Sequence, residues 1–167
     1  MAISKKIEKF LNESKVKYEP IEHKTVFTAY DKAQTLKVPE KIIGKTLTVK
    51  LDKNYGLVLI PANKMLDKKK LLKIANKCLT PEVKHKIRSV DFVKEVWIKK
   101  NLKGVKIGAV PPFGNLWKMP TIIDRSLMNQ PKIILNAGDW NWSIKINPAI
   151  LKKVIQGLII GNISKAK

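Results

Sequence analysis

The sequence predicts an α+β fold in which a single domain holds a mixed, mostly antiparallel β-sheet flanked by helices. Two observations lead to this prediction. Amphipathic helical segments alternate with hairpins and short strands along the chain, and no linker divides it. The chain has 167 residues, of which 44% are hydrophobic, which suffices for one core and is small for two domains. We therefore expect one domain over residues 1–167.

The first part of the chain predicts two helices and a hairpin. An amphipathic helix opens it, because apolar side chains share one helical face: Ile3, Ile7, Phe10 and Leu11. Thr28 is expected to cap a second helix that runs to about Leu36, before Pro39. Strands are expected at Tyr18–Glu22, Thr46–Leu51 and Leu57–Pro61, the last two forming a hairpin about the turn Asp52–Gly56.

The rest of the chain predicts a similar mixture. Helices are expected at Asp67–Asn76, with Asp67 as cap, at Pro81–Arg88, at Asp91–Ile98 and, after Pro148, at Ala149–Gly157. Strands are expected at Val105–Val110, Thr121–Asp124, Lys132–Asn136 and Trp142–Asn147. We expect the core to end near residue 155 and a frayed, lysine-bearing tail to follow.

The charge of the chain indicates a polyanionic partner. Lys plus Arg number 34 and Asp plus Glu 13, a formal net charge of +21. All the cations are lysines except Arg88 and Arg125, and lysine acts as a point charge on phosphate more than as a bidentate reader of bases. Nucleic acid, an anionic membrane surface and an acidic protein all fit this composition, as does a general lysine bias of the proteome.

Targeting signals and paired cysteines are not visible. No apolar run approaches the roughly 18–20 residues of a membrane-spanning helix, and residues 1–15 lack the apolar region of a signal peptide. Cys78 is the only cysteine, so an intrachain disulfide and a thiolate metal cluster are excluded. We expect a soluble, cytoplasmic protein with no membrane partner.

Common catalytic and cofactor motifs fail on inspection. Gly44-Lys45-Thr46 suggests a phosphate-binding loop, but Pro39 occupies the position of the first glycine and a strand, not a helix, follows. His23, His85 and Cys78 are too scattered for a metal site. Nothing resembles a nucleophile elbow or a reactive cysteine, although counting residues does not exclude a catalytic triad. We expect no cofactor, no metal and, in an enzyme, no covalent nucleophile.

The segment Gly108–Gly114 is the most informative one. Pro111 and Pro112 fix φ and supply no N–H, so the segment is stiff and does not fit a central strand. Glycines at both ends allow sharp turns and close approach of a ligand. A row of free amides at Ala109, Val110, Phe113 and Gly114 would suit an oxyanion or carbonyl. The alternative is a rigid turn that places Phe113 in the core.

Several blocks together resemble the YbaK family of aminoacyl-tRNA editing domains, which includes relatives of the prolyl-tRNA synthetase insertion domain. They occur in the family's order over about residues 1–155: Lys45-Thr46-Leu47, Leu57–Pro61, Leu66–Leu71, Gly108–Gly114, Pro120–Asp124 and Asn136-Ala137-Gly138. The resemblance implies the family's curved mixed sheet and a trans-editing deacylase. Such enzymes hydrolyse the ester of a mischarged tRNA, often tRNA(Pro) carrying alanine or cysteine. The alternatives are a non-catalytic module of this fold that binds the tRNA acceptor end or a synthetase, and a nonspecific basic nucleic-acid protein.

The resemblance also implies roles for individual residues. Lys45 would contact the terminal nucleotide or its phosphate. Gly108, Ala109, Val110 and Gly114 would face the aminoacyl carbonyl and amine. Further substrate contacts are expected from His23, Phe27, Thr28, Thr46, Pro111, Pro112, Phe113, Asn136 and Gly138. The partners implied are the CCA end of tRNA and prolyl-tRNA synthetase, with no DNA. An activated ester needs only a positioned water beside an oxyanion-stabilising loop.

Some positions leave alternatives open. His23 is either an orienting or proton-shuttling group or a structural histidine. Asp124 is expected to anchor the Gly108–Gly114 loop. Trp140 and Trp142 either stack on the single-stranded CCA end or pack in the core. Ser143 falls where cysteine-specific members often carry Asp, which departs from the pattern of those members.

Overall fold

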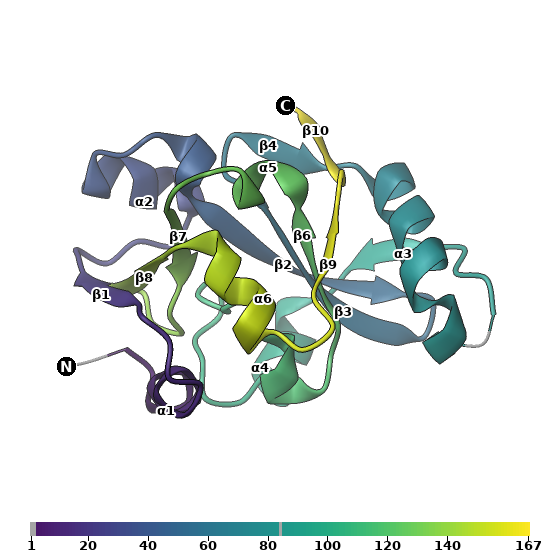
Figure 1. Ribbon diagram of the computed structural model, residues 1–167, viewed down its shortest axis with the longest axis horizontal. Coiled ribbons are helices and arrows are strands. Elements are labelled where there is room, and N and C mark those ends of the chain that lie inside the picture. The colour runs from purple at the N-terminus through teal and green to yellow at the C-terminus, as the bar shows by residue number, and fades with distance from the viewer. Residues whose placement is uncertain (1–2, 84) are drawn as a thin grey trace.

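The computed structural model describes residues 3–83 and 85–167 (Figure 1). Its helices are α1 (Lys5–Glu13), α2 (Ala29–Leu36), α3 (Lys68–Val83), α4 (Glu95–Asn101), α5 (Arg125–Met128) and α6 (Leu151–Val154), with short 3₁₀ turns η1 (Glu40–Ile42), η2 (Gly114–Trp117) and η3 (Pro148–Ile150). Its strands are β1 (Glu19–Glu22), β2 (Gly44–Leu51), β3 (Asn54–Pro61), β4 (Lys64–Leu66), β5 (Val90–Phe92), β6 (Thr121–Asp124), β7 (Ile133–Asn136), β8 (Trp142–Ile146), β9 (Ile159–Gly161) and β10 (Ser164–Ala166).

The β2–β3 hairpin lies at the centre of a five-stranded sheet of order β5-β2-β3-β6-β9. β6 runs parallel to β3 and to β9, whereas β2 is antiparallel to both β3 and β5. A second, antiparallel sheet has the order β1-β8-β7, and a parallel bridge from Ile43 to Ile134 joins it to the start of β2. β10 pairs with β4. The predicted α+β class with a mixed, mostly antiparallel sheet is confirmed.

Alternating side chains of β3 divide the core between the two faces of the central sheet. Val58 and Ile60 pack with Leu71 of α3 on one face. Leu59 packs on the other face in a cluster that includes Phe113 and the apolar side of α1. In Figure 1, α3 accordingly lies at the opposite end of the molecule from α1 and α2.

The predicted helix caps are confirmed. Thr28 Oγ1 accepts a hydrogen bond from the Asp31 amide at 3.0 Å. Asp67 Oδ1 accepts from the amides of Lys69 and Lys70 at the start of α3. Each cap satisfies backbone donors that have no partner within the helix, which fixes where α2 and α3 begin.

The segment predicted as a strand over Val105–Val110 is irregular. Gly104 and Gly108 both have positive φ, +88° and +85°, and β-structure needs negative φ. The prediction failed because glycine permits either sign of φ and the sequence does not reveal which one is used.

The helices predicted at Pro81–Arg88 and Asp91–Ile98 are also wrong in part. α3 continues to Val83, residue 84 lies outside the described residues, and residues 85–89 are not helical. The Ile87 amide donates to Asn76 Oδ1 and the Arg88 amide to the Asp52 carboxylate, so side chains replace helical acceptors there. Residues 90–92 form β5, and α4 begins only at Glu95.

The C-terminal residues are not the frayed tail that we expected. β9 extends the central sheet beside β6, and Ile163 is fully buried. Asp124 Oδ1 accepts a hydrogen bond from the Ile163 amide, and Asp124 also caps α5 at Ser126. Asp124 is therefore structural, as expected, but it anchors the chain end and not the Gly108–Gly114 loop. Within the described residues, no helix is long and apolar enough to cross a membrane.

Candidate active site

Three segments distant in sequence meet at a small enclosed pocket. It is lined by the start of α2, by the first residues of the Gly108–Gly114 loop and by the residues that follow β7: Val26, Phe27, Thr28, Lys32, Gly108, Ala109, Asn136, Asp139 and Trp140. Its volume is about 10 Å³, which is close to the space that one water molecule requires. The pocket therefore holds a water or a very small group unless its walls move.

Lys32 supplies a buried positive charge to this pocket. Its side chain is 5% exposed, and Nζ donates a hydrogen bond to Asn136 Oδ1 at 2.6 Å. Burial disfavours the ammonium form and lowers the pKa of Lys32 to about 8. Asn136 Nδ2 in turn donates to the Val110 carbonyl at 3.1 Å. The charge on α2 is thus coupled through one amide to the backbone of the loop.

The first half of the Gly108–Gly114 loop reaches the pocket, and the second half enters the core. The Ala109 carbonyl accepts from the Gly138 amide at 2.8 Å, which holds the loop against the end of β7. Phe113 is fully buried and its ring lies 5.2 Å from that of Phe10. The core alternative considered for Phe113 is therefore correct for its side chain.

Of the four loop amides that we expected to be free, two donate hydrogen bonds within the protein. The Ala109 amide donates to the Lys106 carbonyl at 3.0 Å, and the buried Gly114 amide donates to Thr121 Oγ1 at 3.1 Å. Within the described residues, the amides of Val110 and Phe113 have no acceptor. The sequence alone did not show that turns and the Thr121 side chain would supply acceptors for two of these amides.

Two aromatic rings form the outer wall of the pocket. The Phe27 and Trp140 rings pack edge to face with centroids 5.1 Å apart. Trp140 Nε1 donates to the Ile107 carbonyl at 2.7 Å, whereas Phe27 is 61% exposed and has room to move. Trp140 therefore lines the candidate site, while Trp142 packs against the core.

Asp139 completes the polar side of the pocket. Burial acts to raise the pKa of Asp139, but hydrogen bonds from the Asn141 amide and Lys106 outweigh it, so the pKa lies below its usual value. Lys106 Nζ lies 2.9 Å from the carboxylate and 5.0 Å from the centre of the Trp140 ring. The pocket is thus lined by one cation, Lys32, and by one anion, Asp139, which is paired with Lys106.

His23 lies beside the pocket but does not line it. Its Nδ1 is 2.8 Å from the Lys24 carbonyl and its Nε2 is 2.8 Å from Ser143 Oγ. Because a carbonyl only accepts, Nδ1 carries the hydrogen, and the neutral ring accepts from Ser143 through Nε2. Burial, the largest influence, lowers the pKa of His23. This geometry supports the structural alternative for His23.

Lys45 and Thr46 do not line this pocket, although the start of β2 lies beside β7. Lys45 lines a separate hollow of about 650 Å³ with Met65, Asp67 and Lys165, and not the pocket at Gly108. Burial, followed by the charge of Lys167, lowers the pKa of Lys45. Thr46 projects from the opposite face of β2, and within the described residues its buried Oγ1 has no hydrogen-bond partner.

The structure therefore brings together only some of the predicted site residues. Five of them line the pocket: Phe27, Thr28, Gly108, Ala109 and Asn136. Hydrogen bonds hold Val110 and Gly138 next to these residues. The other predicted residues do not line the pocket: Lys45, Thr46 and His23, together with Pro111, Pro112, Phe113 and Gly114, which are buried in the loop's second half. Thr28 also serves as the cap of α2.

Sequence reasoning missed Lys32 and Asp139. Lys32 occurs between Ala29 and Leu36 at helical spacing, on the side of α2 that carries the buried Ala33. A lysine at a core-facing position of a short helix was the available signal. Within the described residues, no three His, Cys, Asp or Glu side chains gather as metal ligands would.

Comparison with solved structures finds the same fold. The crystal structure of the hypothetical protein APE2540 matches with a TM-score of 0.81 at 21% identity, covering 96% of this chain and 100% of that chain. A crystal structure described as that of "a putative trans-editing enzyme for prolyl tRNA synthetase" matches with a TM-score of 0.77 at 19% identity, covering 98% and 97%. No curated protein matches this chain.

Comparison with protein families identifies the chain more directly. The sequence model of the aminoacyl-tRNA editing domain matches residues 23–154. This range contains the whole of the pocket, from Val26 to Trp140, and most of the central sheet. The protein therefore belongs to the aminoacyl-tRNA editing domain family.

Proposed function

We propose that this protein is a trans-acting aminoacyl-tRNA deacylase that hydrolyses the ester between a wrongly attached amino acid and the terminal adenosine of tRNA. The observation that carries the proposal, within a chain of this family, is the meeting of Lys32, Gly108 and Trp140 at one enclosed pocket. A buried cation beside a loop that admits close backbone approach suits the negative charge that develops on an ester carbonyl oxygen.

The reaction in this proposal uses water and no covalent enzyme intermediate. Water adds to the ester carbonyl carbon, and the carbonyl oxygen becomes an oxyanion stabilised by the ammonium group of Lys32. The bond from carbon to the ribose oxygen then breaks. One proton of the water goes to the ribose oxygen, and the other is released as the amino acid leaves as a carboxylate. Asp139, which lines the pocket, binds the α-ammonium group of the aminoacyl moiety in this proposal.

The small volume of the pocket supports a small aminoacyl group. A cavity of about 10 Å³ admits a methyl or thiol group after a modest movement of the exposed Phe27, but not a large side chain. We propose alanine or cysteine on tRNA(Pro) as the substrate. The likeness in fold to a protein described as a trans-editing enzyme for prolyl-tRNA synthetase supports this choice and suggests that synthetase as a partner.

Lys45 belongs to tRNA binding in this proposal. Its hollow also contains Lys68, Lys69 and Lys165, and Lys68 Nζ lies 4.9 Å from the centre of the exposed Phe92 ring. Such a cluster of cations beside an aromatic ring attracts the phosphates and bases of RNA. Lys45 then contributes to affinity for the tRNA body, and the chemistry takes place at the Lys32 pocket.

The test is a deacylation panel. tRNA(Pro) charged with alanine, cysteine or proline, and other mischarged tRNAs, are incubated with the wild-type protein and with Lys32→Met. We expect release of alanine or cysteine by the wild type and a loss of about 100-fold in kcat for Lys32→Met, as for removal of one oxyanion-stabilising group. No release from any member of the panel would show instead a non-catalytic tRNA- or synthetase-binding module.

A further inference from the structure

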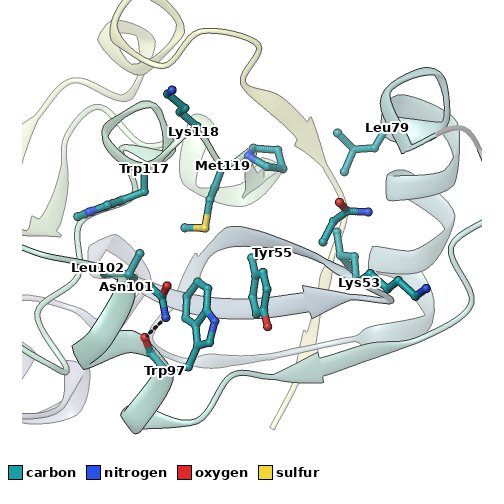
Figure 2. A pocket seen from close by; sticks show the side chains of 12 residues that line it. Lys53, Tyr55, Leu79, Trp97, Asn101, Leu102, Trp117, Lys118 and Met119 are labelled. Carbon is teal, nitrogen blue, oxygen red and sulfur yellow. Dashed lines mark hydrogen bonds between the residues drawn. The ribbon is translucent and has the colours of Figure 1, made fainter.

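A further hollow, which shares no lining residue with the Lys32 pocket, lies at the turn of the central hairpin (Figure 2). Its volume is about 430 Å³, within the range of small-molecule binding sites. Its aromatic residues come from three elements: Tyr55 from β3, Trp97 from α4 and Trp117 from η2. Figure 2 shows Met119 between these rings, facing the space that they surround.

The aromatic walls are flat, partly exposed and held in place. The Tyr55 and Trp97 rings stack with centroids 4.0 Å apart and planes inclined by 15°. Asn101 Nδ2 donates to the Trp97 carbonyl at 2.9 Å, which fixes the last turn of α4 (Figure 2). All three rings are half-buried, so part of each remains open to solvent. Stacked, fixed rings with open surface are the platforms on which unpaired nucleic-acid bases stack.

Positive charge surrounds these rings. Lys53 and Lys118 are exposed at the rim of the hollow. Lys50 Nζ lies 5.7 Å from the centre of the Tyr55 ring, and Lys6 Nζ lies 5.4 Å from that of Trp117. A base bound in the hollow would carry its phosphates to this rim. Aromatic rings with lysines at their edges match a nucleotide, which is flat on one side and anionic on the other.

A neighbouring groove shares one lining residue with the hollow and another with the candidate active site. Leu102 lines both the hollow and this groove of about 370 Å³, and Trp140 lines both the groove and the Lys32 pocket. The groove between them carries Lys99, Lys103 and Lys106. Lysines therefore follow the whole surface path from the aromatic hollow to Trp140.

We propose that this path binds the unpaired 3′ strand of tRNA, with one unpaired base stacked in the hollow of Tyr55, Trp97 and Trp117. The inference rests on the proposed function, since it takes the strand's aminoacyl end to lie at the Lys32 pocket. Phosphates follow the three lysines of the groove, and Trp140 marks the entry to the pocket. The hollow thereby sets how far the unpaired strand extends before the duplex begins.

The test uses uncharged RNA, so that it does not depend on deacylation. Two RNA hairpins with the same stem, one ending in a single-stranded 3′ ACCA and one blunt, are titrated with protein by fluorescence anisotropy. We expect Tyr55→Leu to weaken binding of the ACCA hairpin about tenfold, as loss of one stacked base does, and to leave the blunt hairpin unchanged. Tyr55→Phe keeps the ring and is expected to bind like the wild type.

Charge variants give an independent measurement. Each lysine contact to single-stranded RNA contributes about 0.7 to the slope of log affinity against log salt. Lys53→Gln with Lys118→Gln should therefore reduce the slope for the ACCA hairpin by about 1.4. The control, Lys41→Gln with Lys132→Gln, removes the same charge from exposed positions outside the hollow. Its salt slope for the ACCA hairpin should stay close to that of the wild type. Thermal unfolding of each variant reports its folding.

Two outcomes would overturn the inference. Equal loss of affinity for both hairpins in Tyr55→Leu, or no loss for either, would show that Tyr55 does not hold the unpaired strand and that Trp97 and Trp117 only pack against Leu57 and Leu102. If AMP displaces the labelled ACCA hairpin at the same concentration as unlabelled ACCA hairpin does, the hollow is a site for free nucleotides and not for a strand. Binding as expected without activity in the deacylation panel would overturn the proposed function alone.

Discussion

Lys32 Nζ donates a hydrogen bond of 2.6 Å to Asn136 Oδ1, which joins a buried ammonium group on α2 to the end of β7. The acceptor is a neutral amide, and within the described residues no carboxylate forms an ion pair with Lys32. A buried cation without a counter-ion is costly and rare. Such a charge at an enclosed pocket is typical of a group that meets an anion only when ligand binds.

The cost of burying Lys32 predicts how stability depends on pH. Its pKa is about 8 in the folded protein against 10.5 for the free side chain. The unfolded chain binds more protons between these values, so the stability contribution of Lys32 is fully present above pH 10.5 and is lost as pH falls through about 8. The free energy of unfolding of the wild type relative to Lys32→Met should rise by about 2–3 kcal/mol from pH 7 to pH 10.

Denaturant unfolding at several pH values measures this difference. Lys41→Met, at an exposed position, is the matched control and should show no such relative change. A wild type and Lys32→Met whose difference in unfolding free energy is constant with pH would show that Lys32 keeps an ordinary pKa.

The same titration predicts the pH dependence of deacylation. The ammonium form of Lys32 stabilises the oxyanion in our proposal, and this form is lost as pH rises through about 8. The enzyme-catalysed rate, corrected for spontaneous ester hydrolysis, should therefore fall above pH 8 in the wild type. The residual rate of Lys32→Met should lack this decline. A wild-type rate that rises steadily to pH 9.5 would remove Lys32 from the role of cation.

The conformation of Gly108 gives a prediction about the loop. Its φ of +85° strains any residue with a side chain, although an added Cβ would meet nothing closer than the Phe27 carbonyl at 3.5 Å. Gly157 is a matched control, with φ of +71° and open space around it. Both alanine variants should lose about 1–2 kcal/mol of stability, measured by denaturant unfolding. Only Gly108→Ala should also lose deacylation activity, and equal activity in both variants would contradict a role for the loop.

The regular elements could be predicted because each depends on local patterns. The cap at Thr28 and the apolar run of β3 are set by neighbouring residues, and both agree with the structure. β9 was missed because Ile159–Gly161 is short and becomes a strand only by pairing with β6, far away in the sequence. Long-range pairing of this kind has no local signal.

The candidate site could be predicted only in part, for a similar reason. The loop at Gly108 was identifiable by its glycines and prolines. The identity of its free amides was not, because the acceptors of Ala109 and Gly114 are set by turns and by Thr121. Lys32 becomes distinctive only when α2 packs next to Asn136 and buries its charge. Burial of a common residue type is a property of the fold.

His23 is expected to act on stability and not on chemistry. The neutral ring accepts from Ser143, and burial lowers its pKa, as does the nearby charge of Lys32. Its contribution to stability is therefore fully present above pH 6.5 and is lost as pH falls through its lower folded pKa. The unfolding free energy of the wild type relative to His23→Gln should decrease in acid, while kcat should change by less than about threefold, well below the effect of losing a catalytic acid or base. A large loss of kcat in His23→Gln, together with a difference in unfolding free energy that does not change in acid, would show that His23 is catalytic.

Lys45→Ala separates tRNA binding from catalysis. Because Lys45 lines a hollow apart from the Lys32 pocket, its loss should raise the KM for mischarged tRNA and leave kcat nearly unchanged. One phosphate contact to RNA corresponds to about a threefold to tenfold change in affinity at low salt, and the change should shrink as salt is raised. Steady-state deacylation at two salt concentrations measures both, and Lys132→Ala, an exposed lysine outside this hollow, is the control. If Lys45→Ala instead lowers kcat with KM unchanged, Lys45 acts on the bound ester and the hollow must close toward the Gly108 loop during the reaction.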